Sequence, residues 1–151
     1  MIISAHVGAG ALIGTALRRP LPAFAAGFVS HLAMDMVPHW GAGPGRSWVP
    51  VARRDGVAGL VAMGILTAAA PPGRRLALLA GMSGACLPDT DKIGIYFVGR
   101  SPWPRRFDRF HGRIQRESTD LLPRDVLVAA ALSTAAGGLL HLLSRSRPAR
   151  P

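Results

Sequence analysis

Residues 30–40 read SHLAMDMVPHW and close an apolar run of the 151-residue chain. His31 and Asp35 are four residues apart, so a helix here would carry both side chains on one stripe. Burying an unpaired polar group costs roughly 2–7 kcal/mol, and more when the group is charged. A divalent metal ion would satisfy the imidazole and the carboxylate together. The pair therefore indicates a metal site at the end of this helix.

The rest of the chain is apolar, with few aromatic residues. Hydrophobic residues make up 49%, aromatic residues 6%, and the mean hydropathy is +0.27. Together with abundant Ala and Gly, this composition favours closely packed helices over a sandwich of strands. We expect a single helical membrane domain over residues 1–144 and a basic tail over residues 145–151. A soluble, all-helical, alanine-rich domain is the alternative.

Five apolar runs bounded by Arg, Pro or Gly organise the chain: 2–17, 21–37, 56–70, 76–87 and 126–143. Only the last reaches the ~18 residues expected of a membrane span, so the others would have to be tilted or extended by flanking residues. None shows a clean polar face. We therefore predict an all-α fold, a membrane helical bundle of four to five apolar helices, placed as a multi-pass protein of the cell inner membrane.

One polar segment has a different pattern. Phe107, Phe110 and Ile114 recur at helical spacing among arginines, which predicts an amphipathic helix lying on a membrane face. The single Cys86 lies in an apolar run, which excludes a disulfide framework and indicates a buried thiol. Because no Lys or Arg precedes the first apolar run, a removable signal peptide is not expected.

The basic residues are spread along the chain. Eighteen Lys and Arg against eight Asp and Glu give a net charge of +10. These cations lie between the apolar runs and do not form one stripe, which fits membrane headgroups better than nucleic acid. We expect membrane lipids as partners and no nucleic acid.

Ionisable side chains fall at matching ends of the apolar runs. If successive runs alternate in direction, as short connections require, these side chains reach one face of the bundle. Two of them, Asp89 and Asp91, lie in the turn after Pro88, where paired carboxylates can flank a cation. The predicted metal ligands are His6, His31, Asp35, Asp89, Asp91 and His111. The predicted catalytic groups are His39 and Asp91.

Each candidate has another interpretation when taken alone. Asp89 fits a helix N-cap, and His6 fits a histidine bonded to a backbone carbonyl. His39 fits an interfacial residue beside Trp40, and His111 fits a headgroup contact. Taken together, mixed imidazole and carboxylate ligands favour zinc, manganese or iron over calcium, with zinc expected. The number of candidate ligands allows one or two ions.

With these residues in place, the chain resembles the bacterial family of small inner-membrane proteins described as membrane-bound metal-dependent hydrolases. That family carries an early His, a Leu-Pro-Asp-x-Asp element ending an apolar helix, a later His, and a Ser-His-x-x-x-Asp element. The matching residues here are His6, Leu87-Pro88-Asp89-Thr90-Asp91, His111, and Ser30-His31 with Asp35. Two features depart from the pattern: Lys92 replaces the usual His after the Asp-x-Asp element, and the two motifs occur in the reverse order.

The HxxxD motif followed by Pro38-His39 is also distantly similar to a helix motif of the zinc phospholipase C and single-strand nuclease superfamily. The members of that superfamily use a zinc cluster to cleave phosphodiesters. These resemblances imply a membrane-embedded metal-dependent hydrolase acting on a phosphodiester or a lipid-derived ester, with nearby Arg holding phosphate.

Two other functions remain open at this point. A non-enzymatic metal-binding or metal-transporting membrane protein would use intramembrane His and Asp as an ion path. It would place the ligands near mid-span, whereas the candidates here lie at helix ends. A structural protein, in which the polar residues only cap helices and bind lipid phosphates, would need no metal.

Overall fold

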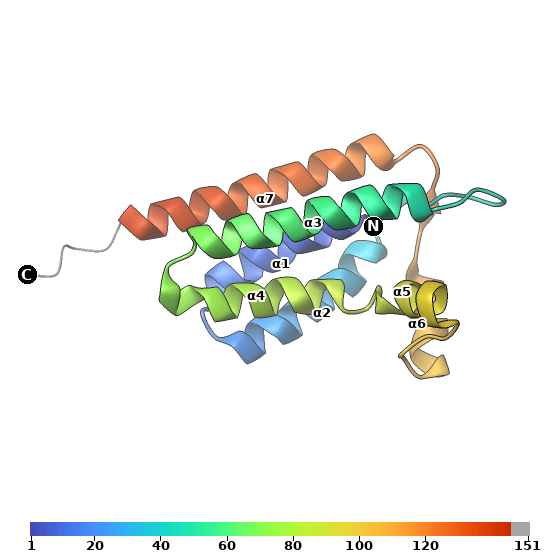
Figure 1. Ribbon diagram of the computed structural model, residues 1–151, viewed down its shortest axis with the longest axis horizontal. Coiled ribbons are helices and arrows are strands. Elements are labelled where there is room, and N and C mark those ends of the chain that lie inside the picture. The colour runs from blue at the N-terminus through green and yellow to red at the C-terminus, as the bar shows by residue number, and fades with distance from the viewer. Residues whose placement is uncertain (146–151) are drawn as a thin grey trace, which may run out of the picture.

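The computed structural model of the chain describes residues 1–145 and is all-helical apart from two very short strands (Figure 1). The elements in order are α1 (Ile3–Leu17), α2 (Pro20–Asp35), β1 (His39–Trp40), α3 (Val49–Ala69), α4 (Pro72–Cys86), α5 (Thr90–Val98), α6 (Arg105–Ile114), β2 (Glu117–Ser118) and α7 (Leu122–Arg145). The all-α expectation is therefore confirmed.

Prolines, and residues whose backbone is in the left-handed conformation, set several of the helix boundaries. Pro20, Pro50 and Pro72 occupy the first turns of α2, α3 and α4, where a missing N–H costs nothing. Arg18, with φ of 57°, ends α1 and lets the chain reverse at once into α2. Gly99, with φ of 74°, ends α5 in the left-handed conformation that glycine adopts without strain.

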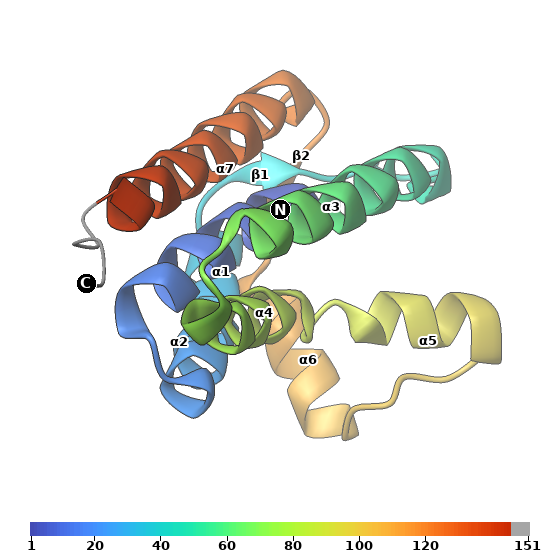
Figure 2. The same ribbon diagram turned by 60° about the vertical axis from the view of Figure 1, so that its left-hand side comes forward.

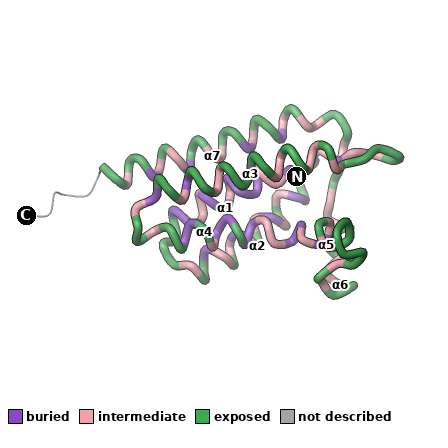
Figure 3. Tube along the Cα trace, in the orientation of Figure 1, coloured by how far each residue is buried: buried purple, intermediate pink, exposed green. Residues whose placement is uncertain are grey.

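Helix α1 is the central element of the bundle. Figures 1 and 2 show it surrounded by α2, α3, α4 and α7. The main core joins Val7 and Ala11 of α1 to Leu78 and Met82 of α4 and to Leu140 of α7. Figure 3 shows the buried residues gathered on these inner faces, whereas the outward faces of α3 and α7 are largely exposed.

Glycines bring α1 and α4 into backbone contact. A Cβ added at Gly10 would lie 2.5 Å from the carbonyl oxygen of Gly81 and 2.7 Å from the Cα of Met82. Gly81 in turn lies directly against the Gly10 carbonyl. Small residues of this kind allow two helix backbones to approach closely.

At the end of the bundle where α5 and α6 lie, two contacts join segments that are distant in the sequence. Strands β1 and β2 pair in parallel, with His39 opposite Glu117 and Trp40 opposite Ser118. The N–H of Trp40 also donates to Asp125 Oδ2 at 2.9 Å, at the start of α7. The segment after α2 is thereby held beside the segment after α6.

The prediction of four to five apolar membrane helices is wrong. Among the described residues only α7 is long and apolar enough to cross a membrane. Helices α1, α2 and α4 have 15, 16 and 15 residues, so they extend only about 22–24 Å, short of a ~30 Å hydrocarbon core. Helix α3 has 21 residues, but Arg53, Arg54 and Asp55 interrupt its apolar sequence. A multi-pass arrangement is accordingly not supported.

The predicted amphipathic helix corresponds to α6. Its arginines are exposed, while Phe107 and Ile114 are half-buried. The ring of Phe107 lies 4.5 Å from Trp103 and 5.9 Å from Phe28 of α2, measured between centroids. The apolar face of α6 is therefore directed partly toward the protein itself. Of the predicted basic tail, Arg145 is the last residue of α7, and the other residues lie outside the described part of the chain.

Candidate metal centre

Four buried or nearly buried side chains from separate parts of the chain meet in one cluster. His31 and Asp35 come from the last turns of α2, Asp89 from the turn between α4 and α5, and His111 from α6. Each offers one donor atom, and these atoms all lie within 4.8 Å of one another. A His and Asp group able to hold a metal ion, as the sequence predicted, is therefore present.

The donor atoms are spaced as the ligands of one ion would be. The Nε2 atoms of His31 and His111 are 3.2 Å apart, and they lie 3.1 and 3.2 Å from Asp35 Oδ2. His31 Nε2 is 3.8 Å from Asp89 Oδ1. In a tetrahedral zinc site with bonds of 2.0–2.1 Å, ligand atoms lie about 3.4 Å apart. The donor atoms of His31, Asp35 and His111 are within a few tenths of an ångström of that spacing, and Asp89 is the ligand that would have to move closer.

Both histidines are oriented by a partner on their other nitrogen. His31 Nδ1 lies 2.7 Å from the carbonyl oxygen of Ala85, and His111 Nδ1 lies 3.0 Å from Asp91 Oδ2. Each Nδ1–H can donate there, which leaves the Nε2 lone pair directed at the cluster. This arrangement is typical of metal-ligating histidines. Asp91 thus contacts His111 and is placed to orient it.

His6 adds an unsatisfied imidazole to the same place. Its ring stacks on that of His31 with centroids 3.9 Å apart, and its Nε2 is 3.3 Å from Asp35 Oδ1. The side chain is fully buried, yet neither ring nitrogen has a hydrogen bond of acceptable geometry. Buried polar atoms without partners are rare in folded proteins. His6 Nε2 is such an atom and lies beside Asp35, where an additional metal ligand would lie.

The charges around Asp35 hold this carboxylate ionised. Burial by itself would raise the pKa of Asp35, but the neighbouring imidazoles of His111, His31 and His6 outweigh burial and hold that pKa far below its ordinary value. Burial lowers the pKa of His6 to about 4, so His6 is neutral. Burial also acts to lower the pKa of His111, but hydrogen bonds to Asp35 and Asp91 raise it to about 9. In the absence of an ion, a proton on His111 therefore supplies a positive charge beside Asp35, in addition to that of the Met1 amino group.

Three further groups at the cluster were not assigned to it from the sequence. Lys92 Nζ lies 2.8 Å from Asp89 Oδ1, and despite the desolvation of both groups this pairing lowers the pKa of Asp89 and raises that of Lys92. The side-chain amide of Gln115 lies 3.2 Å from His111 Nε2. The backbone amino group of Met1 lies 2.6 Å from Asp35 Oδ1. Gln115 follows His111 by four residues, and that spacing is the signal that could have identified it.

His39, a predicted catalytic group, lies in a different setting. It is buried in β1, its Nδ1 lies 2.9 Å from the carbonyl oxygen of Val37, and its Nε2 has no partner. It is outside the group of donor atoms formed by His31, Asp35, Asp89 and His111. Because α2 ends at Asp35 and His39 lies in the extended segment β1, the His39 side chain does not continue the stripe of His31 and Asp35.

One side of the cluster opens into a cavity. Asp89 and Lys92 both line a cavity of about 720 Å³ that extends away from the histidines between α1, α3 and α4. His31, Asp35 and His111 are fully buried, whereas the side chains of Asp89 and Lys92 are 12% and 37% exposed. A ligand would therefore reach the cluster past Asp89 and Lys92.

Comparison with known proteins gave no match to the chain among family models, curated proteins or solved structures.

Proposed function

We propose that this protein is a metal-dependent hydrolase that acts on a phosphodiester or a lipid-derived ester. The observation that carries the proposal is the combination of four donor atoms within 4.8 Å with a cavity that reaches one of them, Asp89. Structural zinc sites are closed, whereas catalytic ones keep a position open to water or substrate.

Some residues of the cluster would bind the ion and others would orient those ligands. His31, Asp35, Asp89 and His111 would hold the ion, with His6 beside them as an additional donor. Asp91 and the Ala85 carbonyl fix the orientation of the two ligating imidazoles. When bound there, a divalent ion, with zinc expected and manganese as the alternative, would supply Lewis acidity and a lower pKa for water.

Lys92 gives the site a cation on the cavity side. Its ammonium is paired with Asp89 at 2.8 Å and is part of the cavity wall. An anionic phosphodiester, or the negative charge that develops on an ester as it is attacked, would be stabilised by a positive group at that position.

We also propose that α7 brings the protein to the cell inner membrane. Only 17% of its most apolar 18-residue stretch is buried within the protein, unlike the core helix of a water-soluble domain. Arg124 and Arg145 lie near its two ends, where lipid headgroups would meet them. Membrane lipids are then partners, and a lipid-derived substrate would be close at hand.

The test is a hydrolysis assay of the purified full chain, loaded with zinc or manganese, on a panel of aryl phosphodiesters and aryl esters of different chain length. We expect metal-dependent turnover that His31→Ala and Asp89→Ala each reduce at least a hundredfold. His141→Ala, an exposed residue of α7 remote from the cluster, is the matched control and keeps full activity. Metal-loaded protein without turnover on any substrate would instead favour a metal-binding or metal-transporting protein.

A further inference from the structure

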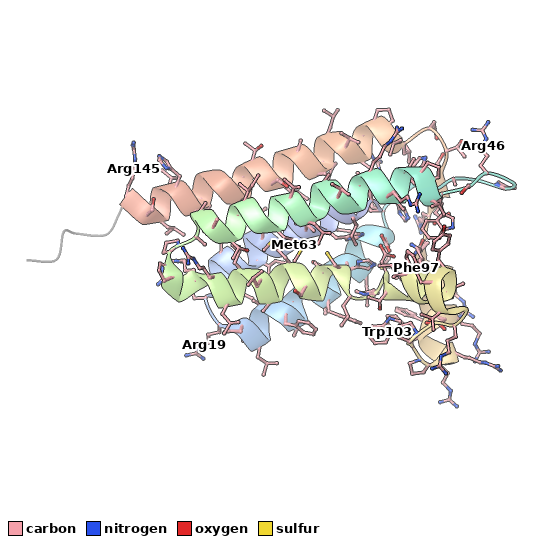
Figure 4. The ribbon with its side chains drawn as sticks, viewed as in Figure 1. Arg19, Arg46, Met63, Phe97, Trp103 and Arg145 are labelled. Carbon is pink, nitrogen blue, oxygen red and sulfur yellow. The ribbon has the colours of Figure 1, made fainter. Side chains whose placement is uncertain are left out.

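The cavity beside the cluster has the size of a small-molecule binding site. Its volume of about 720 Å³ falls within the 300–1,000 Å³ typical of ligand pockets. It lies between α1, α3 and α4 and is closed on one side by the loop before α3, which contributes Pro44, Arg46 and Trp48. Figure 4 shows Arg46 at the end of the molecule and Met63 in the middle of the bundle, so the cavity runs inward from the loop.

Small residues on one face of α3 create this space. Ala52, Gly56, Gly59 and Met63 all line the cavity and recur at intervals of three or four residues, so they form a single stripe. The stripe extends about 16 Å along the helix. A Cβ at Gly56 would meet nothing within 4 Å, and a Cβ at Gly59 would make ordinary contacts with methyl groups of Ile3 and Val7 at 3.5 Å and with the Cα of Ser4 at 3.8 Å. The volume that side chains would ordinarily fill is thus left to a ligand.

Two polar groups of the otherwise largely apolar cavity wall are already hydrogen-bonded within the protein. Asp55 is already engaged at the start of α1, where it accepts from the N–H of Ile3 at 2.5 Å and from the hydroxyl of Ser4. The Thr90 hydroxyl donates to the Leu87 carbonyl and accepts from the indole of Trp103. A peptide or sugar along this wall would leave buried polar groups unpaired, whereas a hydrocarbon chain would not.

Besides Asp55 and Glu117, the cavity wall carries charged groups at two places where a polar end could lie. Asp89 and Lys92 join the cavity to the metal cluster, and Arg46 extends from the loop at its outer end. An occupant that matches this wall has a long apolar part and one polar group. We propose that the cavity binds the acyl chain of a single-chain amphiphile, whose ester linkage lies at Asp89 and Lys92. The position of the ester rests on the proposed hydrolase function, but binding of the chain does not.

The experiment measures chain binding without catalysis. The full chain in the presence of a chelator is titrated with the fluorescent fatty acid cis-parinaric acid, and unlabelled fatty acids of increasing length compete. We expect the competitor's affinity to rise with each added methylene, because each one is transferred from water to the apolar wall. A series without dependence on chain length would overturn the proposal.

A matched pair of variants on α3 locates the binding site. Gly56→Phe places a ring in the cavity and is expected to weaken chain binding at least tenfold. Gly64→Phe introduces the same side chain two turns further along α3, at an exposed position with open space outside the cavity wall, and is expected to change binding less than twofold. Equal binding by the wild type and a folded Gly56→Phe variant would contradict the assignment. If Gly56→Phe does not fold, Ala52→Leu on the same stripe serves in its place, with the same expected loss of binding and the same contradicting result.

The outcomes separate this inference from the proposed function. If Gly56→Phe abolishes chain binding and the wild type hydrolyses no substrate, the acyl-chain site is supported and the hydrolase function is contradicted. If the wild type hydrolyses water-soluble esters and Gly56→Phe leaves chain binding unchanged, the hydrolase function is supported and the acyl-chain site is contradicted.

Discussion

The contact between Asp91 and His111 shows how a single carboxylate can act on the cluster without belonging to it. Asp91 Oδ2 lies 3.0 Å from His111 Nδ1, so it fixes the tautomer that leaves Nε2 free for an ion. The charge of Asp91 also makes the imidazole a better electron donor. The sequence identified both residues as candidates, but it gave Asp91 the roles of ligand and catalytic group, whereas the geometry favours an orienting role.

Replacing Asp91 by Asn tests that orienting role. The amide keeps the shape of the carboxylate but loses its charge, so we expect zinc affinity to fall 10–100-fold, the range found for partners of ligating histidines. Competition with a chelating dye measures this affinity. Asp108→Asn is the matched control, because Asp108 bonds to the Ser101 hydroxyl at 2.8 Å and is not part of the cluster. An unchanged affinity in Asp91→Asn would show that Asp91 does not orient the ligand.

Some site residues could be predicted from local spacing and others could not. His31 and Asp35 were accessible because an i, i+4 pair on an apolar helix points to one place. The Ala85 carbonyl that orients His31 comes from a residue 54 positions later, and no local pattern reveals it. The same holds for Lys92: the sequence marked it as a departure, but only the fold shows that it pairs with Asp89.

The contact between α1 and α4 depends on the absence of side chains at a few positions. Gly10 and Gly81 face each other so closely that each helix's backbone fills the space a Cβ would need. Gly27 of α2 also lies against the Gly81 carbonyl. This three-helix contact holds α2, which carries His31 and Asp35, against α4, which leads to Asp89.

The variant Gly81→Ala tests the importance of this contact. Its added methyl would meet the Gly10 carbonyl, and we expect it to lower the free energy of unfolding by about 1–3 kcal/mol, as overpacking does. Gly138→Ala on α7 is the control: nothing lies within 4 Å of its Cβ, so better helix propensity should stabilise the protein by up to about 1 kcal/mol. Urea unfolding followed by circular dichroism measures both. Equal effects of the two variants would mean that α1 and α4 do not need this close approach.

The apolar runs predicted the helices well, but not their relation to a membrane. Runs 2–17 and 21–37 correspond closely to α1 and α2, because Pro20 and the Arg pair before it mark the boundary. The membrane prediction failed on helix length. Helices of 15 or 16 residues are long enough to pack in a bundle but too short to cross a membrane. Only α7 satisfies both criteria among the described residues.

Across the whole molecule, the cluster ties together segments that are distant in the chain. Its ligands come from the end of α2, the turn before α5 and the last turn of α6, and all three lie at the end of the bundle where α1 begins (Figure 1). Alternating helix direction made this convergence predictable from the sequence. The cavity was not predictable, since it depends on which glycines of α3 face α1 and which face outward.

The same arrangement means that a bound ion should stabilise the entire fold. An ion that binds the folded chain and not the unfolded one adds about 2.7 kcal/mol when its free concentration is a hundred times Kd. The ion would also replace the proton on His111, which the raised pKa of about 9 keeps bound near neutral pH when no ion is present. Because that proton must leave, zinc affinity should increase as the pH rises toward 9.

The most direct test is therefore the zinc stoichiometry of the purified full chain, measured by elemental analysis and by calorimetric titration at pH 8. We expect at least one tightly bound zinc per chain in the wild type and in His141→Ala, with a raised Tm. In both His31→Ala and Asp89→Ala we expect at least hundredfold weaker binding. Zinc content that is unchanged in these two variants, or absent from the wild type, would contradict the presence of a metal site at this cluster.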